Sequence, residues 1–214
     1  GTVALGNAAD VDRAVAAASA AFESFSQTSK EERLALLRRI KALSEARLED
    51  MAQAMREEMG APITMARELQ ADAAIGHLQG FIDALEGLEA RKRLETGDIL
   101  VREPIGVCGL ITPWNWPINQ IVLKVLPAIA AGCTCVLKPS EHTPVSALVY
   151  ADLLHDAGVP AAARAAAPPP PRRPRVLYVA NNRYSVGENF PRRLTTGASK
   201  KADDDEEDGV AEQM

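Results

Sequence analysis

The segment Val-Cys-Gly-Leu-Ile-Thr-Pro-Trp-Asn-Trp-Pro, residues 107–117, passes from an apolar run into a turn bounded by two prolines. It contains both tryptophans of the chain, one on each side of Asn115. Residues 107–111 are apolar and partly β-branched, which is typical of a buried strand. Pro117 can occupy the first position of a helix, where no backbone N–H is needed. The segment therefore predicts a strand, a stiff turn and a helix.

The residues that follow repeat this pattern. Apolar side chains at helical spacing predict a helix from Pro117 to Gly132, and they are Ile118, Ile121, Val122, Val125, Leu126 and Ile129. A second apolar strand is expected at 134–137, and Thr143-Pro144 predicts the N-cap and first position of a helix that runs to His155. Strand, helix, strand and helix form a βαβα unit, in which the strands should be parallel and the crossover right-handed.

Three helices are predicted ahead of this unit, at residues 8–26, Ser29 to Gly60 and about Ile63 to Glu89. Ser29 and Glu32 have the spacing of a capping box, and Gly60 followed by Pro62 is typical of a helix end. The third helix should turn one apolar stripe inward, formed by Met65, Leu69, Ile75, Leu78, Ile82 and Leu85. A further short strand is expected at 99–101.

The composition of the chain limits the classes of protein to consider. Its 214 residues are 47% hydrophobic and 25% charged, which suits a globular protein, and its net charge of −5 gives no reason to expect nucleic acid. No apolar stretch reaches the roughly 20 residues of a membrane span. Cys108, Cys133 and Cys135 lie in apolar runs without a signal peptide, which predicts reduced thiols and a cytoplasmic protein. No second Cys/His pair accompanies them, so no metal site is expected.

A polar motif follows each predicted strand of the βαβα unit. Pro-Trp-Asn-Trp, residues 113–116, follows the first strand, and Lys-Pro-Ser-Glu, residues 138–141, follows the second. Ligands of parallel α/β sheets bind beyond the carboxyl ends of the strands, so both motifs mark a candidate site. Two interpretations of the first motif stay open, a ligand site and a stiff structural turn with aromatic packing. The glycine fingerprint of the usual dinucleotide pyrophosphate loop is absent from the first turn.

Residues from about Glu103 to Pro160 resemble the aldehyde dehydrogenase superfamily. The resemblance rests on P-W-N, on a lysine nine residues after the asparagine, on A-A-G-C and on K-P-S-E. Residues 8–88 are also similar to the N-terminal helices of that family, including Glu-Met-Gly-Ala-Pro at 58–62. The resemblance implies an α/β fold in which these helices precede the first βαβα of a Rossmann-like parallel sheet. Residues 1–160 would then form a truncated N-terminal, cofactor-binding domain.

The family oxidises aldehydes to carboxylic acids with NAD or NADP, using a cysteine nucleophile and a glutamate base. By resemblance, Asn115 is the amide of the oxyanion hole, and Lys124 has a charge-relay role, with an ordinary helix-surface lysine as the open alternative. Lys138 and Glu141 match the pair that holds the adenosine ribose. A carboxylate there would repel a 2′-phosphate, which favours NAD over NADP. The other cofactor-binding residues that the resemblance implies are Ile111, Thr112, Pro113, Trp114, Asn115, Pro139 and Ser140.

The resemblance stops after Pro160. Residues 161–214 are rich in Pro and Arg and then acidic, with four prolines at 168–171 and six acids at 203–208, which predicts a disordered tail. The nucleophile and the base of the family have no match, because the three cysteines lie in or beside predicted buried strands, where a thiol is a poor nucleophile. We therefore expect a truncated, catalytically incomplete member of the family. The abrupt break also fits a shifted reading frame or a wrongly joined gene, which transcript sequencing would test.

Other classes of function remain as alternatives. The chain could be a non-catalytic helical interaction protein that pairs with full-length relatives, or it could form a homo-oligomer. The expected small-molecule partner is an aldehyde, whose identity the sequence does not reveal, and neither nucleic acid nor a membrane is expected. A Pro/Arg-rich ligand segment at 168–175 is disfavoured, because its three arginines are offset by the acidic run.

Overall fold

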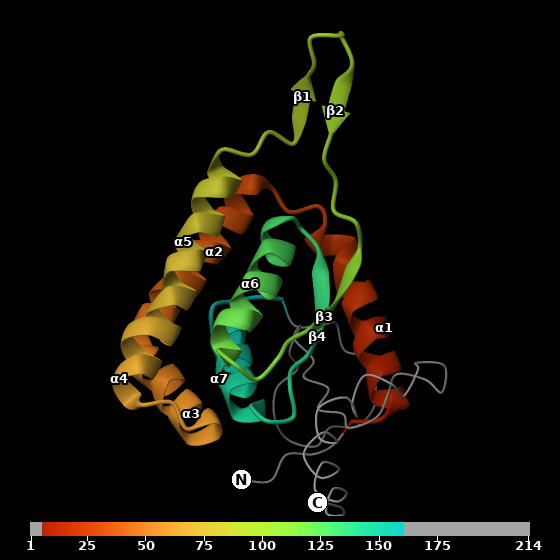
Figure 1. Ribbon diagram of the computed structural model, residues 1–214. Coiled ribbons are helices and arrows are strands. Elements are labelled where there is room, and N and C mark those ends of the chain that lie inside the picture. The colour runs from red at the N-terminus through yellow and green to blue at the C-terminus, as the bar shows by residue number, and fades with distance from the viewer. Residues whose placement is uncertain (1–5, 161–214) are drawn as a thin grey trace, which may run out of the picture. The chain divides into compact units, whose positions relative to one another are not determined.

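The computed structural model describes residues 6–160, so the predicted disordered tail at 161–214 lies outside the described residues. The elements in chain order are α1 (Ala8–Phe25), α2 (Lys30–Ala46), α3 (Leu48–Met59), α4 (Ile63–Met65), the π-helical segment η1 (Ala66–Ala71), α5 (Asp72–Glu86), β1 (Arg91–Arg93), β2 (Ile99–Val101), β3 (Val107–Ile111), α6 (Pro117–Ala130), β4 (Thr134–Lys138) and α7 (Pro144–Asp156) (Figure 1). The predicted α/β class is confirmed.

Strands β3 and β4 form a parallel pair, as the βαβα pattern predicts. Their register runs from Val107 opposite Thr134 to Ile111 opposite Lys138. Helix α6 connects the two strands and packs on one face of the pair, and α1 packs on the other face (Figure 1). The hydroxyl of Thr134 donates to the carbonyl oxygen of Ala18 at 2.8 Å, which joins β4 directly to α1. Because the strands are parallel, their carboxyl ends lie at the same edge.

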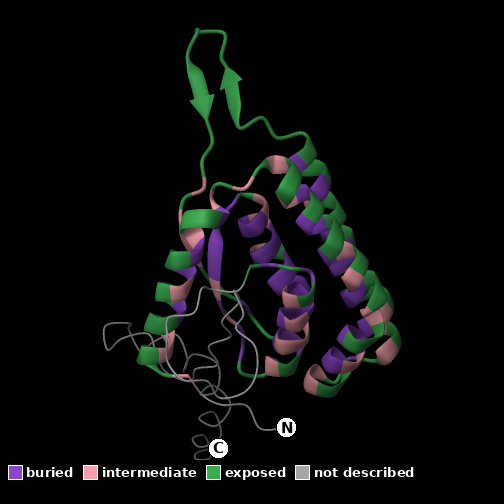
Figure 2. Ribbon diagram, turned by 180° about the vertical axis from the view of Figure 1, so that it is seen from behind, coloured by how far each residue is buried: buried purple, intermediate pink, exposed green. Residues whose placement is uncertain are grey.

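The core is continuous from the helices to the strands. Helix α5 packs against α2 and α6, and α3 packs against α7. The buried faces of these helices point toward one another in Figure 2. Among the largest fully buried side chains are Leu37, Ile40, Met51, Met55, Leu78, Ile118, Leu126, Leu137 and Leu153. The βαβα unit is therefore supported by the N-terminal helices as well as by its own crossover helix.

The single helix predicted from Ser29 to Gly60 is wrong, although both of its ends are confirmed. Ser29 and Glu32 form the capping box, and Gly60 ends α3 in the left-handed conformation at φ 71°. Between them the helix breaks at Arg47, which has φ −110° and ψ 22°. The buried hydroxyl of Ser44 donates back to the carbonyl oxygen of Ile40 at 2.8 Å, and such bonds compete with regular helix. The break lets α2 face α5 while α3 faces α7.

The third predicted helix contains a widened turn that the apolar pattern does not reveal. Residues 66–71 are π-helical, and α5 ends at Glu86 rather than at Glu89. The predicted stripe also departs from regular helical spacing between Leu69 and Ile75, which are six residues apart. Leu69, which was predicted to face inward, is 55% exposed, whereas Gln70 is fully buried.

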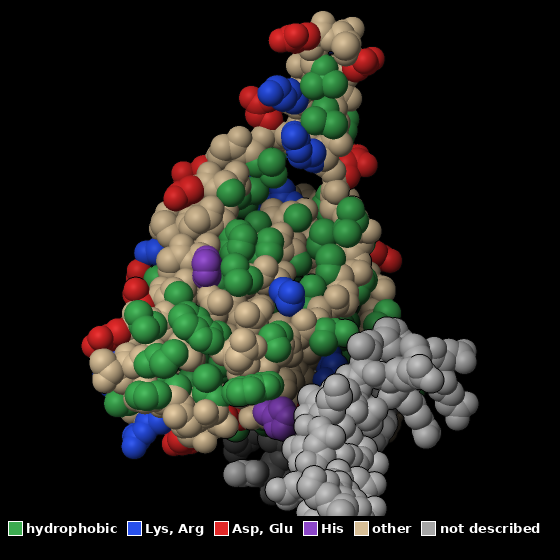
Figure 3. Space-filling view, viewed as in Figure 1, with side chains coloured by type: hydrophobic (Ala, Val, Ile, Leu, Met, Phe, Trp, Pro, Cys, Tyr) green, Lys and Arg blue, Asp and Glu red, His purple; other side chains and the backbone are tan. Residues whose placement is uncertain are grey.

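Two further predictions need correction. The predicted strand at 99–101 is present as β2, but it pairs antiparallel with β1, which was not predicted. All residues of this hairpin are exposed, and it projects from the end of β3 and β4 opposite to their carboxyl ends (Figures 1 and 2). Figure 3 shows hydrophobic side chains on the hairpin, which carries the exposed Ile99, Leu100 and Val101. At α7, Pro144 is at the first position as predicted, but the side chain of Thr143 makes no capping bond.

Candidate active site

The first motif forms a constrained turn after β3. Thr112, just past the strand, is buried and donates its N–H to the carbonyl oxygen of Lys138 at 3.2 Å, so the pairing of the two strands extends beyond β3. Trp116 precedes α6 with φ 57° and ψ 54°, a left-handed conformation that is uncommon for a bulky residue. Pro117 then begins α6. The chain is thus held on both sides of Asn115, whose side chain is exposed rather than packed in the core.

The second motif forms the turn after β4. Lys138 is the last residue of the strand, and its Nζ lies 3.7 Å from Oε2 of Glu141. The ammonium group also donates to the carbonyl oxygen of Pro139 at 3.4 Å. Ser140 is buried, and its Oγ accepts from the backbone N–H of His142 at 3.3 Å. Lysine and glutamate therefore leave the turn side by side, and both remain partly exposed to solvent.

The charge state of Glu141 follows from its surroundings. A hydrogen bond from its own backbone N–H, reinforced by the charge of Lys138, lowers the pKa of the Glu141 carboxyl below its ordinary value. At neutral pH this group is an anion that can only accept hydrogen bonds. Lys138 supplies up to three N–H donors beside it. The pair thus offers donors and acceptors to one polar ligand.

The two turns lie next to each other. The rings of Trp114 and His142 meet edge to face, with centroids 6.5 Å apart and an interplanar angle of 79°. Together with the hydrogen bond from Thr112 to Lys138, this contact brings the first and second motifs together at the carboxyl edge of β3 and β4. Sequence reasoning assigned no role to His142, and nothing in its local pattern indicates this ring contact.

No hydrogen bond or ion pair joins Lys124 to the turns after β3 and β4 among the described residues. It lies on α6, seven residues after Pro117, which corresponds to about 10 Å along the helix axis. Its side chain is half-buried, and within residues 6–160 it forms no recorded hydrogen bond or ion pair. Asn119, in the first turn of α6, was missed by sequence reasoning. Its Oδ1 is buried and has no hydrogen-bond partner among the described residues, and the detectable signal is a polar residue on an apolar helix face.

The three cysteines lie in or beside the parallel strands. Cys108 of β3 is directly opposite Cys135 of β4, and Cys133 precedes β4. Burial raises the pKa of the Cys108 thiol, and burial raises the pKa of Cys135 to about 12. A neutral thiol is a poor nucleophile, so neither residue is suited to attack a carbonyl carbon. Within residues 6–160, no cluster of His, Cys, Asp and Glu has an arrangement suited to a metal ion.

Comparison with known proteins gives a consistent result. The sequence model of the aldehyde dehydrogenase family matches residues 1–168. A 3-succinoylsemialdehyde-pyridine dehydrogenase from a Pseudomonas species is 50% identical over 161 residues, which are 75% of this chain and 34% of that protein. Putative aldehyde dehydrogenases from Staphylococcus aureus are 45% identical over 160 residues, again covering 75% of this chain and 34% of the relative.

Solved structures agree with the sequence matches. Aldehyde dehydrogenase C of Pseudomonas syringae, a mutant solved with NAD+ and octanal, superposes with a TM-score of 0.74 at 50% identity and covers 84% of this chain and 34% of its own. The aldehyde dehydrogenase of Bartonella henselae gives a TM-score of 0.74 at 41% identity. The match covers 84% of this chain and 36% of the Bartonella chain. The chain thus spans about a third of the length of these relatives. Among the helices of residues 6–160, none has the length and apolar character that crossing a membrane requires.

Proposed function

Because this chain belongs to the aldehyde dehydrogenase family, we propose that residues 111–141 form the cofactor-ribose and oxyanion part of an NAD-dependent aldehyde oxidation site. One observation carries the proposal. The turn with Asn115 and the turn with Lys138 and Glu141 lie together beyond the carboxyl ends of two adjacent parallel strands. That edge is where parallel α/β sheets bind their ligands.

The Lys138–Glu141 pair fits the ribose of a dinucleotide. The separation of 3.7 Å between Nζ and Oε2 is longer than a strong hydrogen bond, so the two groups do not exhaust each other's hydrogen-bonding capacity. An ammonium group can donate to ribose hydroxyls, and an ionised carboxylate can accept from the 2′-hydroxyl. The same carboxylate would repel a 2′-phosphate, which supports NAD rather than NADP. Bound NAD would supply the hydride acceptor of the reaction.

The turn around Asn115 fits an oxyanion hole. Its side-chain amide can donate to a carbonyl oxygen that becomes negative during nucleophilic attack, and a donor that is already in place need not reorient. The unusual backbone of Trp116 and the two prolines restrict the turn that carries this amide. Removal of such a donor typically raises the barrier by about 3 kcal/mol. Ile111, Thr112, Pro113 and Trp114 would line the cofactor groove on this side, and Pro139 and Ser140 on the other. Lys124 remains a candidate for the charge-relay role that the family resemblance implies.

We further propose that the 214-residue polypeptide does not oxidise aldehydes by itself. The family reaction needs a cysteine thiolate, and all three cysteines of the chain lie in or beside the parallel strands, two of them with raised pKa values. The check is NADH formation from NAD+ and an alkyl aldehyde such as octanal. NADH formation that scales with the concentration of the purified chain and disappears in a variant lacking all three cysteines would overturn this proposal.

Binding of the cofactor can be tested separately from turnover. Both tryptophans lie in the first turn, so fluorescence excited at the indole band reports on this site, and ADP-ribose serves as the probe. Lys138→Ala should weaken binding about tenfold, since bonds to charged groups are worth about 1.5–3 kcal/mol. The control is Lys92→Ala, which lies on the exposed hairpin at the other end of the sheet. Equal affinity of both variants, or no binding by the wild-type chain, would refute the proposed function.

The alternative of a non-catalytic helical interaction protein has no support in the comparisons, because these matches include the nucleotide-site motifs as well as the helices. Cytoplasmic location, homo-oligomer formation and pairing with an intact relative stay predictions.

A further inference from the structure

We infer that Glu58 is a positioning residue that holds the Lys138–Glu141 turn in place by capping α7 from α3. This inference rests on the proposed function of that turn in nucleotide binding. Glu58 would not touch the nucleotide. It would act through the first turn of α7, which follows the proposed ribose-binding pair directly in the chain.

The contact itself is short and paired. The two carboxylate oxygens of Glu58 accept from the backbone N–H groups of Val145 and Ser146, at 2.5 and 2.6 Å. The first N–H groups of a helix have no partner within the helix, and Thr143 supplies no side-chain cap here. A negative carboxylate also complements the positive end of the helix dipole. A residue 87 positions earlier therefore takes the place of a local cap.

The turn is tied closely to the capped helix. Only His142 and Thr143 separate Glu141 from Pro144. Thr143 is 1% exposed, and its N–H donates to the carbonyl oxygen of Ser140 at 3.3 Å. A shift of the first turn of α7 would therefore move the backbone that carries the lysine–glutamate pair.

The opposite end of α7 is held by Arg39 of α2 and by Arg47, the C-cap residue of α2. Arg39 donates through Nε to the carbonyl oxygen of Ala157 at 2.9 Å, and Nη2 of Arg47 lies 2.5 Å from Oδ2 of Asp156. Both arginines place positive charge at the carboxyl end of the helix, where the dipole favours it. Loss of Glu58 would thus release only the end of α7 that adjoins the turn.

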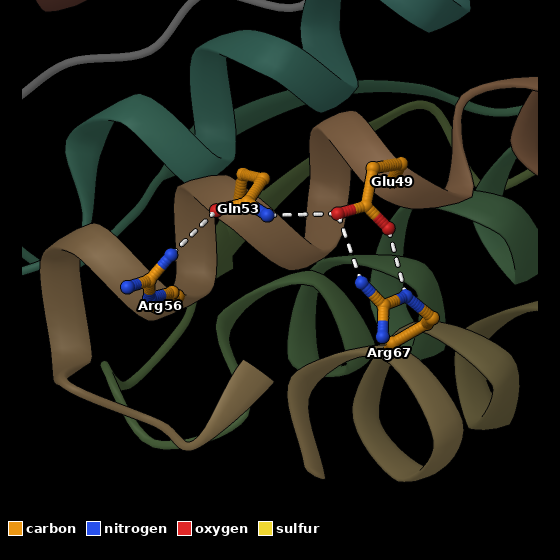
Figure 4. A network of polar contacts seen from close by, with 4 residues as sticks. All are labelled: Glu49, Gln53, Arg56 and Arg67. Atoms are coloured by element: carbon orange, nitrogen blue, oxygen red, sulfur yellow. Dashed lines mark hydrogen bonds and ion pairs between the residues drawn. The ribbon is translucent and has the colours of Figure 1, made fainter. Parts of the chain in front are cut away.

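Helix α3, which carries Glu58, is held in position by contacts of its own. Arg67 of η1 donates to both carboxylate oxygens of Glu49, at 2.8 and 3.0 Å, and Gln53 donates to the same carboxylate at 2.7 Å (Figure 4). On the inner side of α3, Met51 and Met55 are completely buried. The helix is therefore held by contacts that do not involve α7, and its last turn projects Glu58 toward Val145 and Ser146.

The test compares Glu58→Ala and Glu58→Gln with Glu57→Ala and Glu57→Gln in the full chain. Glu57 is the adjacent residue and is exposed, so it matches the chemical change without the cap. Amide hydrogen exchange at 138–143 and at Val145 and Ser146 reports how well the backbone of the turn and of the first turn of α7 is protected. Affinity for ADP-ribose, measured well below the unfolding temperature, reports the consequence.

We expect Glu58→Ala to speed exchange across 138–143 and to weaken ADP-ribose binding about fivefold, the factor that corresponds to one lost helix cap. Glu58→Gln keeps one acceptor oxygen, so its exchange rate and its ADP-ribose affinity should fall between those of Glu58→Ala and wild type. If Glu58→Ala does not fold, the Glu58→Gln variant provides the test. Neither Glu57 variant should differ from wild type. Faster exchange confined to Val145 and Ser146, or unchanged affinity, overturns the inference. Absence of ADP-ribose binding in wild type rejects the proposed function instead, and exchange at 138–143 then decides alone whether Glu58 positions the turn.

Discussion

Nζ of Lys138 and Oε2 of Glu141 lie 3.7 Å apart at the end of β4, close enough for attraction and too far for a strong hydrogen bond. Each group is partly exposed, with 34% and 43% of its side chain accessible. The attraction between two such groups contributes little to stability by itself. Both groups therefore keep hydrogen-bonding capacity for the ribose contact proposed above, whereas Nη2 of Arg38 and Oε1 of Glu86 are only 2.5 Å apart.

The first prediction concerns the choice between cofactors. Glu141→Gln removes a negative charge whose lowered pKa keeps it ionised at neutral pH. We expect the variant to bind ADP-ribose about tenfold more weakly, because a charged acceptor is lost, and to discriminate less against 2′-phospho-ADP-ribose. Titration calorimetry with both probes gives the ratio of the two dissociation constants. An unchanged ratio would show that Glu141 does not face the 2′ position.

A second prediction follows from the glycine between α6 and β4. Gly132 has φ +80°, and a Cβ at this position would lie 3.0 Å from Cγ of Pro104 and would collide with the guanidinium of Arg33. Gly132→Ala should therefore lower the free energy of unfolding by about 1–3 kcal/mol. Chemical denaturation measures this value. The matched control is Gly80→Ala in α5, where a Cβ meets nothing within 4 Å and where alanine should stabilise the helix by about 0.5–1 kcal/mol.

A third prediction concerns alkaline pH. Burial raises the pKa of Cys135 to about 12 in the folded chain, above its ordinary value of 9.0. The unfolded chain therefore releases this proton first, and folding stability falls as pH rises above 9. Between pH 8 and 10 the free energy of unfolding should drop by about 1 kcal/mol more in wild type than in Cys135→Ala. Parallel pH-dependent slopes for the two proteins would contradict the burial of this thiol.

The sequence predicted the parts of the fold whose cause is local. The strand at 107–111, the helix begun by Pro117 and the capping box at Ser29 all follow from neighbouring residues, and the structure contains each of them. The burial expected for that strand is wrong, since none of the residues of β3 is buried and Ile111 is 69% exposed. The juxtaposition of the two motifs follows from the parallel pairing of β3 and β4. The cap on α7 could not be predicted, because Glu58 is distant in sequence and its reach depends on how α3 packs. The contact of Trp114 with His142 was missed for the same reason.

The exposure of Leu69 in η1 is the correction with the sharpest test. The predicted inward stripe includes both Leu69 and Leu78, yet nine residues are about 2.5 turns of an α-helix, and Leu69 is 55% exposed while Leu78 is fully buried. Leu69→Gln should therefore change the free energy of unfolding by no more than about 0.5 kcal/mol. Leu78→Ala should lower it by about 2–5 kcal/mol, since it leaves a cavity in the core. Chemical denaturation of both variants tests the placement of Leu69, because an inward-facing Leu69 would make its substitution costly as well.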